Sequence, residues 1–184
     1  MKKAVIAVAT LLAAAGISVG TLLAFKSKSE KAAVEESATL ADNVLFQFDA
    51  DDVQRLDIES AGVSYTAELI DGSWKMTSTS ADTFDLNQVT LQGVCSYMSV
   101  LTAETSYGEA TEENKAKYGL DDPYVITAYD SEGSYTLYVG NQSPTGEYYY
   151  VCTGDKKNIY AAGTSAVQPI LTDRMLLKND KFTD

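Results

Sequence analysis

The stretch from Thr111 to Asp130, TEENKAKYGLDDPYVITAYD, determines how the two parts of this chain are joined. Thr111 is suited to cap a helix whose first turn carries acidic residues. Gly119 stands where a helix ends on a left-handed residue, and Leu120 can make the apolar contact that accompanies this ending. Pro123 prevents the helix from continuing and favours an extended residue before it. The stretch therefore predicts a helix over 111–118, a strand from Tyr124, and a structural joint formed by Gly119, Leu120 and Pro123.

The residues before the joint alternate between apolar and polar positions, which is typical of strands. The segment VSYTAELI, 63–70, is separated from SWKMTST, 73–79, by an Asp-Gly pair that favours a two-residue hairpin turn. A helix is predicted next, with Asp85 as its cap and Gln88 three residues later. Its apolar stripe consists of Leu91, Val94, Cys95, Met98 and Leu101.

The residues after the joint repeat this plan. YVITAYD and SYTLYVG flank a turn at 131–133, and EYYYVCTG and NIYAAG flank a turn at 155–157. A last helix is predicted from about Ser165, with an apolar side formed by Ile170, Leu171, Met175 and Leu176. We therefore predict an α+β domain over 44–184. Its antiparallel sheet would be built from two similar strand-strand-helix halves, about 53–107 and 124–178.

The N-terminal segment, 1–28, has two lysines followed by 22 uncharged residues from Ala4 to Phe25. At about 1.5 Å per residue this run is long enough to cross a bilayer as a helix. A cleaved signal peptide is the alternative, but the apolar run continues beyond the Ala-rich cleavage-like site and favours an uncleaved anchor. Residues 29–43 are charged and alanine-rich, as in a tether. We expect a single-pass protein of the cell membrane with its domain outside the cytoplasm. Because lysines flank both ends of the span, this orientation rests on the signal-like layout.

The charge and the missing residue types exclude several functions. From Glu30 onward the chain has 26 acidic and 10 basic residues, a net charge of −16. Such a domain is not expected to bind nucleic acid, because phosphate contacts need clustered Lys and Arg. The absence of histidine excludes Ser-His-Asp and Cys-His catalysis and His-ligated zinc. Cys95 and Cys152 form no CxxC motif, and both one disulfide and two buried thiols fit the sequence.

Acidic residues do not form a recognisable metal motif. The run DADD, 49–52, lacks the Gly and Glu that a calcium loop requires at its sixth and twelfth positions. The structural role of the joint accounts for the presence of Asp121 and Asp122, so no bound metal is needed to explain them. We therefore expect no metal, no cofactor and no catalytic residue, and we interpret the chain as non-enzymatic.

The twelve tyrosines remain as candidates for binding. Tyr149 is expected to face away from its two tyrosine neighbours, because strand side chains alternate between faces. Exposed aromatic rings can stack on sugars or anchor a protein partner, whereas cross-strand packing is the structural alternative. The candidate partner surface comprises Tyr138, Tyr148, Tyr149 and Tyr150.

Several of these segments in this order resemble a bacterial family known as domain of unknown function 4340. They are GSWKM, YGLDDP, YTLYVGNQSPTGEYYYV, NIYAAG and LTDRMLLKND. The resemblance covers about 53–178. The resemblance implies a membrane-anchored accessory protein encoded near ABC exporters of the gliding-motility type. Its expected partners are subunits of such a transporter or other proteins of the bacterial cell envelope. It implies no catalytic residues. An envelope domain that binds glycans or peptides through exposed tyrosines is the alternative function.

Overall fold

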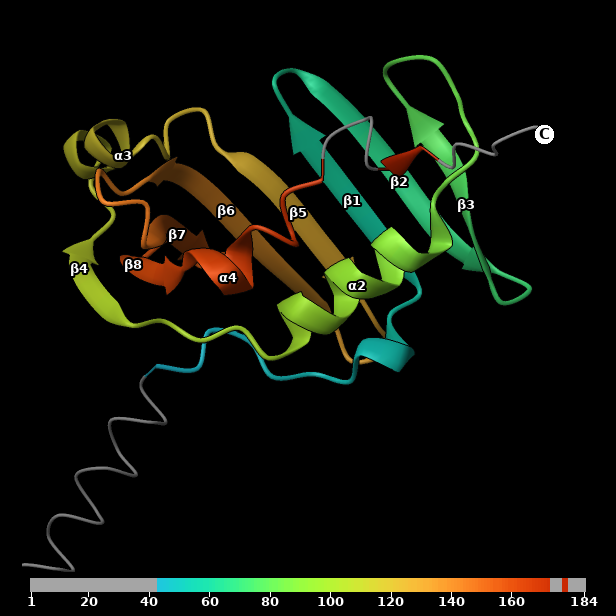
Figure 1. Ribbon diagram of the computed structural model, residues 1–184, viewed down its shortest axis with the longest axis horizontal. Helices are drawn as coiled ribbons and strands as arrows, with labels where there is room; N and C mark the ends of the chain where they lie inside the picture. The colour runs from blue at the N-terminus through green and yellow to red at the C-terminus, as the bar shows by residue number, and fades with distance from the viewer. Residues whose placement is uncertain (1–42, 173–176, 179–184) are drawn as a thin grey trace, which may run out of the picture. The chain divides into compact units, whose positions relative to one another are not determined.

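The structure is a computed structural model that describes residues 43–172, 177 and 178 (Figure 1). The predicted membrane anchor and nearly all of the predicted tether lie outside these residues. Within them, no helix combines the length and the apolar character that a membrane crossing requires. The elements in chain order are η1 (Ala50–Asp52), β1 (Arg55–Ser60), β2 (Val63–Ile70), β3 (Ser73–Thr79), α2 (Gln88–Ser99), β4 (Thr105–Glu109), α3 (Glu112–Tyr118), β5 (Tyr124–Tyr129), β6 (Ser134–Gln142), β7 (Tyr148–Thr153), β8 (Asn158–Gly163) and α4 (Thr164–Val167).

The strands form one eight-stranded antiparallel sheet in the order β3-β2-β1-β5-β6-β7-β8-β4. This confirms the predicted α+β class with an antiparallel sheet. The third and fourth strands of this order, β1 and β5, pair so that Arg55 lies opposite Tyr129 and Glu59 lies opposite Val125. The first strand of each predicted half therefore pairs with the first strand of the other half.

The two predicted halves also exchange their last segments. β4 follows α2 in the chain but pairs with β8, at the far edge of the sheet (Figure 1). In the other direction, Lys178 forms an antiparallel bridge with Leu86, just before α2. The plan of the two halves differs in detail, because three strands precede α2 whereas four precede α4.

Two tight turns set the register of the first three strands. Asp71 and Gly72 have φ angles of 51° and 72°, as the predicted two-residue hairpin requires. Ala61 and Gly62 form a second turn of this kind, with φ angles of 50° and 75°. The second turn was not predicted, because alanine seldom adopts a left-handed conformation.

The predicted cap of α2 is wrong by two residues. The helix begins after Asn87, whose side chain accepts a hydrogen bond from the backbone of Thr90 at 3.2 Å. Gln88 does not complete a capping box with Asp85. Its side-chain amide instead pairs with the backbone of Trp74, accepting from N at 2.6 Å and donating to O at 2.9 Å. Gln88 thus attaches the start of α2 to β3.

The predicted C-terminal helix is wrong in length. α4 has four residues, begins directly after Gly163, and is followed by a turn over 168–170. Pro169 has no N–H to donate to the carbonyl of Ser165, so the helix ends there. Ile170 is nevertheless buried, as its place on the predicted apolar side required. Met175 and Leu176 lie outside the described residues.

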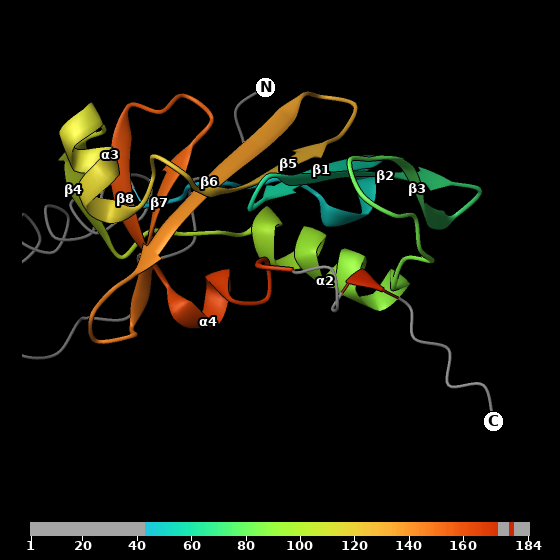
Figure 2. The same cartoon turned by 90° about the horizontal axis from the view of Figure 1, so that it is seen from above.

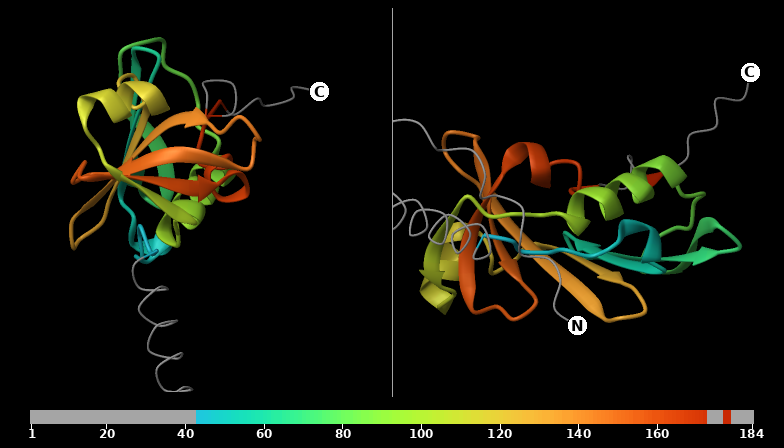
Figure 3. Two further views of the ribbon diagram at one scale, coloured as in Figure 1. Left: turned by 90° about the vertical axis from the view of Figure 1, so that its left-hand side faces the viewer. Right: turned by 90° about the horizontal axis from the view of Figure 1, so that it is seen from below.

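The core has two parts, one on each face of the sheet. α2 and α4 lie on one side of the sheet (Figure 2), where the larger cluster packs around Leu56, Leu91, Met98, Ile126 and Leu137. The smaller cluster contains Leu120, Cys152 and Ile159, with tyrosines of α3, β4, β6 and β7 packed against it. The sheet is strongly twisted, so that β6–β8 cross the direction of β1–β3 (Figure 3). The twist brings α3 and the joint over the face that α2 and α4 leave uncovered.

Candidate functional site

The joint has the geometry that its sequence predicts. The hydroxyl of Thr111 accepts a hydrogen bond from the backbone of Asn114 at 3.2 Å, which caps α3. Gly119 ends the helix with φ 72° and ψ 24°. The backbone N–H of Leu120 donates to the carbonyl of Lys115 at 2.8 Å, and the Leu120 side chain is buried in the smaller cluster. Both the cap and the stop of this helix are therefore confirmed.

A glycine on the neighbouring strand allows the joint to approach the sheet. A Cβ atom at Gly140, on β6, would clash with the carbonyl oxygen of Tyr118 and would lie 3.0 Å from Leu120 Cγ. A Cβ atom at Gly119 would lie 2.5 Å from the side chain of Asn141. The end of α3 thus rests directly on the backbone of β6, and this contact was not predicted from the sequence.

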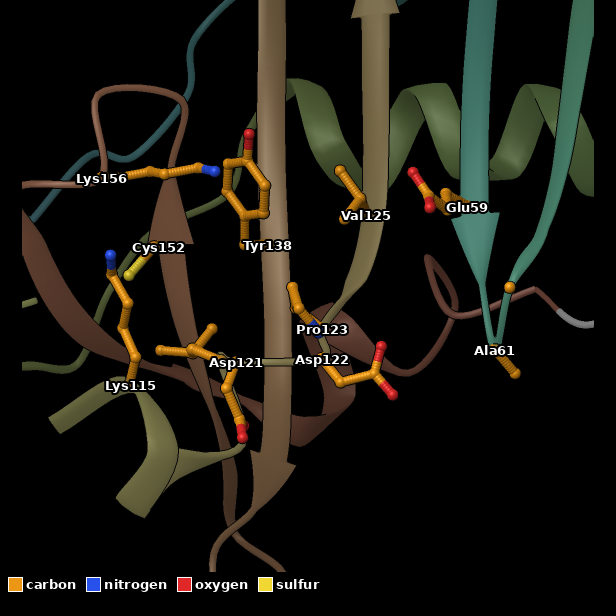
Figure 4. A pocket seen from close by; sticks show the side chains of 12 residues that line it. Glu59, Ala61, Lys115, Asp121, Asp122, Pro123, Val125, Tyr138, Cys152 and Lys156 are labelled. Carbon is orange, nitrogen blue, oxygen red and sulfur yellow. The ribbon is translucent and has the colours of Figure 1, made fainter. Parts of the chain in front are cut away.

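The joint forms one wall of a cleft of about 310 Å³, which we call the joint cleft (Figure 4). Its other walls come from the β1–β2 turn, from β5 and β6, and from the β7–β8 turn. The lining residues are Glu59, Ala61, Gly62, Lys115, Leu120, Asp121, Asp122, Pro123, Val125, Tyr138, Cys152 and Lys156. The cleft therefore gathers Leu120, Pro123 and Tyr138 from the predicted site residues and adds charged residues of both signs.

Two lysines from separate elements reach the joint cleft. The Lys115 ammonium pairs with Glu112 Oε1 at 2.8 Å, and the Lys115 side chain is only 22% exposed. The Lys156 ammonium lies 4.2 Å from the centre of the Tyr138 ring, a cation–π contact. Lys156 has a φ angle of 51°, which few non-glycine residues adopt. A hydrogen bond from its N–H to the carbonyl of Thr153, at 3.0 Å, braces the turn.

The Cys152 thiol lines the joint cleft but is buried and held in its protonated form. Burial raises the pKa of Cys152 to about 11, although the charge of Lys115 acts in the opposite direction. Because the thiolate is the reactive form, this shift lowers the reactivity of Cys152 at neutral pH. Cys95 lies in the larger cluster, where burial raises its pKa to about 12. Both cysteines are free, which decides between the two alternatives in favour of buried thiols.

The predicted tyrosine surface is divided among three environments. Tyr138 lines the joint cleft. Tyr148 and Tyr150 pack against each other, with ring centres 5.5 Å apart, and Tyr107 of β4 packs against both. Tyr149 faces the opposite side of the sheet and packs against the larger cluster, as strand alternation predicts.

Tyr107 is a member of the tyrosine cluster that sequence reasoning missed. Its hydroxyl lies 2.7 Å from that of Tyr148, and this hydrogen bond, together with burial, raises the pKa of Tyr107. The rings of Tyr107 and Tyr118 are 5.5 Å apart, so the cluster also reaches α3. The only available signal was a single aromatic residue, Tyr107, among the small and polar residues of TSYGE, 105–109.

The central strands carry a polar network on the face that α2 and α4 leave uncovered. Arg55 donates two hydrogen bonds to Asp57, at 3.0 and 2.8 Å, and its guanidinium lies 4.9 Å from the centre of the Tyr129 ring. Thr66 donates to the same carboxylate at 2.8 Å. Burial and a hydrogen bond to Asp57 raise the pKa of Tyr129. These groups of the central network therefore satisfy one another.

The acidic runs have structural roles or project outward. Asp49 caps η1 by accepting a hydrogen bond from the backbone of Asp51 at 2.9 Å. The carboxylates of Asp121 and Asp122 point away from the cleft lysines (Figure 4). In the described part of the chain, no three acidic or cysteine side chains gather as metal ligands would.

Comparison with known proteins gives one result. A family model described as a domain of unknown function, DUF4340, matches residues 74–181, more than half of the chain. The match includes the joint, both lysines of the joint cleft and all four residues of the predicted tyrosine surface. No curated protein and no solved structure matches the chain.

Proposed function

The chain belongs to the DUF4340 family, and from this membership we propose that it is a membrane-anchored, non-enzymatic binding domain outside the cytoplasm. It would act as an accessory or interaction module in a complex of the cell envelope. The joint cleft is the observation that carries the proposal. It combines apolar side chains such as Leu120, Val125 and Tyr138 with charged groups of both signs, a combination that can orient a bound segment.

The chemistry of the cleft supports binding rather than catalysis. Its thiol is held in the protonated form by burial, as described above. Lys115 keeps a raised pKa through its hydrogen bond with Glu112, and a lysine that serves as a base or nucleophile needs the opposite shift. The remaining groups are suited to hydrogen bonding, ion pairing and apolar contact.

The link to an ABC exporter rests on the family resemblance of the sequence. The 22 uncharged residues near the N-terminus support a position beside membrane-embedded subunits. A partner segment from such a subunit would be a natural occupant of the joint cleft. Glycan binding through the tyrosines has less support, because Tyr148 and Tyr150 pack within a cluster and Tyr149 packs against the core.

Site-specific photocrosslinking in intact cells tests the proposal. A photoreactive amino acid replaces Asp121, an exposed residue of the cleft wall, and in a matched control it replaces Val89, which is 83% exposed on α2. We expect crosslinks to one envelope protein from position 121 and none to that protein from position 89. Recovery of a transporter subunit would also support the exporter association. Crosslinks from position 89 alone, or from neither position, would contradict the proposed site.

A further inference from the structure

We infer that the joint cleft binds a short peptide segment in one orientation, with a carboxylate beside Lys115 and Lys156 and a basic group beside Glu59. The inference rests on the proposed binding function and specifies its ligand. Figure 4 shows the arrangement: both lysines lie on one side of Tyr138 and Val125, and Glu59 lies on the other. Asp121 and Asp122 also line the cleft, but their carboxylates point away from the lysines, so the lysine side and the Glu59 side carry charges of opposite sign.

The lysine end is available to a new anion. In the described part of the chain, Lys156 makes no ion pair and its ammonium rests on the Tyr138 ring. Lys115 pairs with Glu112, whose side chain is 92% exposed and can be replaced at little cost. Both lysines line the cleft beside Cys152, and their charges act on its thiol together with the opposing charge of Asp155.

The nearest acidic group of the β7–β8 turn is already engaged. Asp155 accepts hydrogen bonds from the Thr153 hydroxyl at 2.9 Å and from the Lys157 backbone at 3.2 Å. It also lies 3.7 Å from the Lys157 ammonium. Asp155 therefore pairs with Lys157, outside the cleft, and leaves Lys156 without a carboxylate partner.

Backbone strain marks the two ends of the same cleft. The described residues include three non-glycine residues with positive φ: Ala61, Asp71 and Lys156. Aspartate tolerates this conformation in a hairpin turn, whereas alanine and lysine do so poorly. Ala61 and Lys156 both line the cleft, one in the β1–β2 turn and one in the β7–β8 turn. Strain of this kind concentrates at functional sites, where a fixed backbone position is needed.

The size of the cleft limits the ligand. A volume of about 310 Å³ is at the lower end of the range for small-ligand sites, roughly 300–1,000 Å³. It accommodates one or two side chains of an extended segment rather than a folded ligand. The apolar groups between the charged ends, Leu120, Pro123, Val125 and Tyr138, would contact the segment along its length.

The test uses the full 184-residue chain, purified in a mild detergent, and a library of synthetic hexapeptides. Each peptide is made with a free C-terminal carboxylate and as a C-terminal amide. We expect selected peptides to carry a carboxylate at one position and Lys or Arg toward the other end. If the amide form of a peptide still binds, an Asp or Glu side chain provides the carboxylate. If the amide form no longer binds, the C-terminus provides it.

Variants then show which residues bind each end of the peptide. The binding of the peptide with the highest affinity is measured by fluorescence anisotropy. Lys156→Gln and Lys115→Gln should each weaken binding by roughly three- to tenfold, the range of a partly exposed charge-assisted contact. Lys157→Gln, in the same turn but outside the cleft, should change it less than about twofold. Glu59→Gln should weaken the binding only of peptides that carry a basic residue.

Peptides selected without an acidic group, equal effects of Lys156→Gln and Lys157→Gln, or failure to select any peptide would each overturn the inference. The thermal unfolding curve of each variant shows that it is folded. Crosslinking from position 121 reports separately on the proposed function, so a cleft that binds a partner of different chemistry would be recognised.

Discussion

Replacing Gly140 with alanine tests whether the end of α3 truly rests on β6. The added methyl group would clash with the carbonyl oxygen of Tyr118 and would lie 3.0 Å from both Gly119 C and Leu120 Cγ. These carbon–carbon distances are below the roughly 3.5 Å at which carbon atoms attract. The carbonyl belongs to the backbone, so a change of rotamer cannot relieve the clash. The end of α3 must move away from the sheet.

The expected loss of stability follows from this movement. Overpacking of a close contact costs about 1–3 kcal/mol. Displacement of Leu120 adds part of the about 1.5–3 kcal/mol that its full burial contributes. We therefore expect the free energy of unfolding to fall by about 2–4 kcal/mol. That is a large share of the roughly 5–15 kcal/mol that is typical of a protein.

The assay is urea unfolding followed by the fluorescence of Trp74, the single tryptophan. Trp74 lies on β3, far along the sheet from the substitution, and so reports on the whole domain. Gly133→Ala is the matched control, because a Cβ atom there meets nothing within 4 Å and no positive φ restricts it. We expect that control to change stability by less than about 0.5 kcal/mol. A Gly140→Ala loss no larger than that of the control would refute the close contact.

Four further predictions concern the joint, the strained turn, the thiols and the pH dependence. Gly119→Ala should cost about 1 kcal/mol or more, because φ is 72° and a Cβ atom would press on a side chain of β6. Ala61→Gly should raise stability by up to about 1 kcal/mol, since glycine adopts a φ of 50° without strain. Cys95 and Cys152, with pKa values of about 12 and 11, should not react with Ellman's reagent at pH 8 until the protein unfolds. Hydrogen bonds from Lys157 and Thr153 lower the pKa of Asp155, so its contribution should be present above about pH 4 and lost as the pH falls further.

Each of these four predictions can be contradicted by a specific result. Unchanged melting temperatures would contradict the two backbone predictions. Rapid modification of either thiol in the folded protein would contradict its burial. For the carboxylate, Asp155→Asn should flatten the acid side of the stability curve, and an identical curve would show that the group does not contribute.

Local signals in the sequence were sufficient for the joint and for the first hairpin. Gly119 and the Asp71-Gly72 pair each meet a backbone requirement that few residues satisfy, so their positions predict the structure nearby. The cap of α2 failed because Asp85 and Asn87 are equally suited to cap a helix. The choice between them depends on Gln88, whose amide pairs with β3, a contact between residues 14 positions apart.

The joint cleft could not be predicted, because its walls come from distant parts of the chain. Glu59, Lys115, Tyr138 and Lys156 meet only when the sheet order is known. The run Tyr148–Tyr150 predicted that its three side chains alternate between the two faces of the sheet. It did not predict which residues pack against them. That Tyr148 joins a cluster depends on Tyr107, which β4 brings to the opposite edge of β8.

The exchange of segments between the two halves has a consequence for how the protein folds. The β1–β5 pair joins residues about 70 positions apart, and β4 has no neighbour until β8 exists. A chain delivered from its N-terminus would therefore present an open edge of β1 until β5 has emerged, and would leave β4 unpaired until β8 has emerged. Pairings of such long sequence separation are slow to form, and open edges invite aggregation in the meantime. Completion of the sheet should thus be a late event in folding, and a protein with this topology has reason to depend on chaperones until β8 is available.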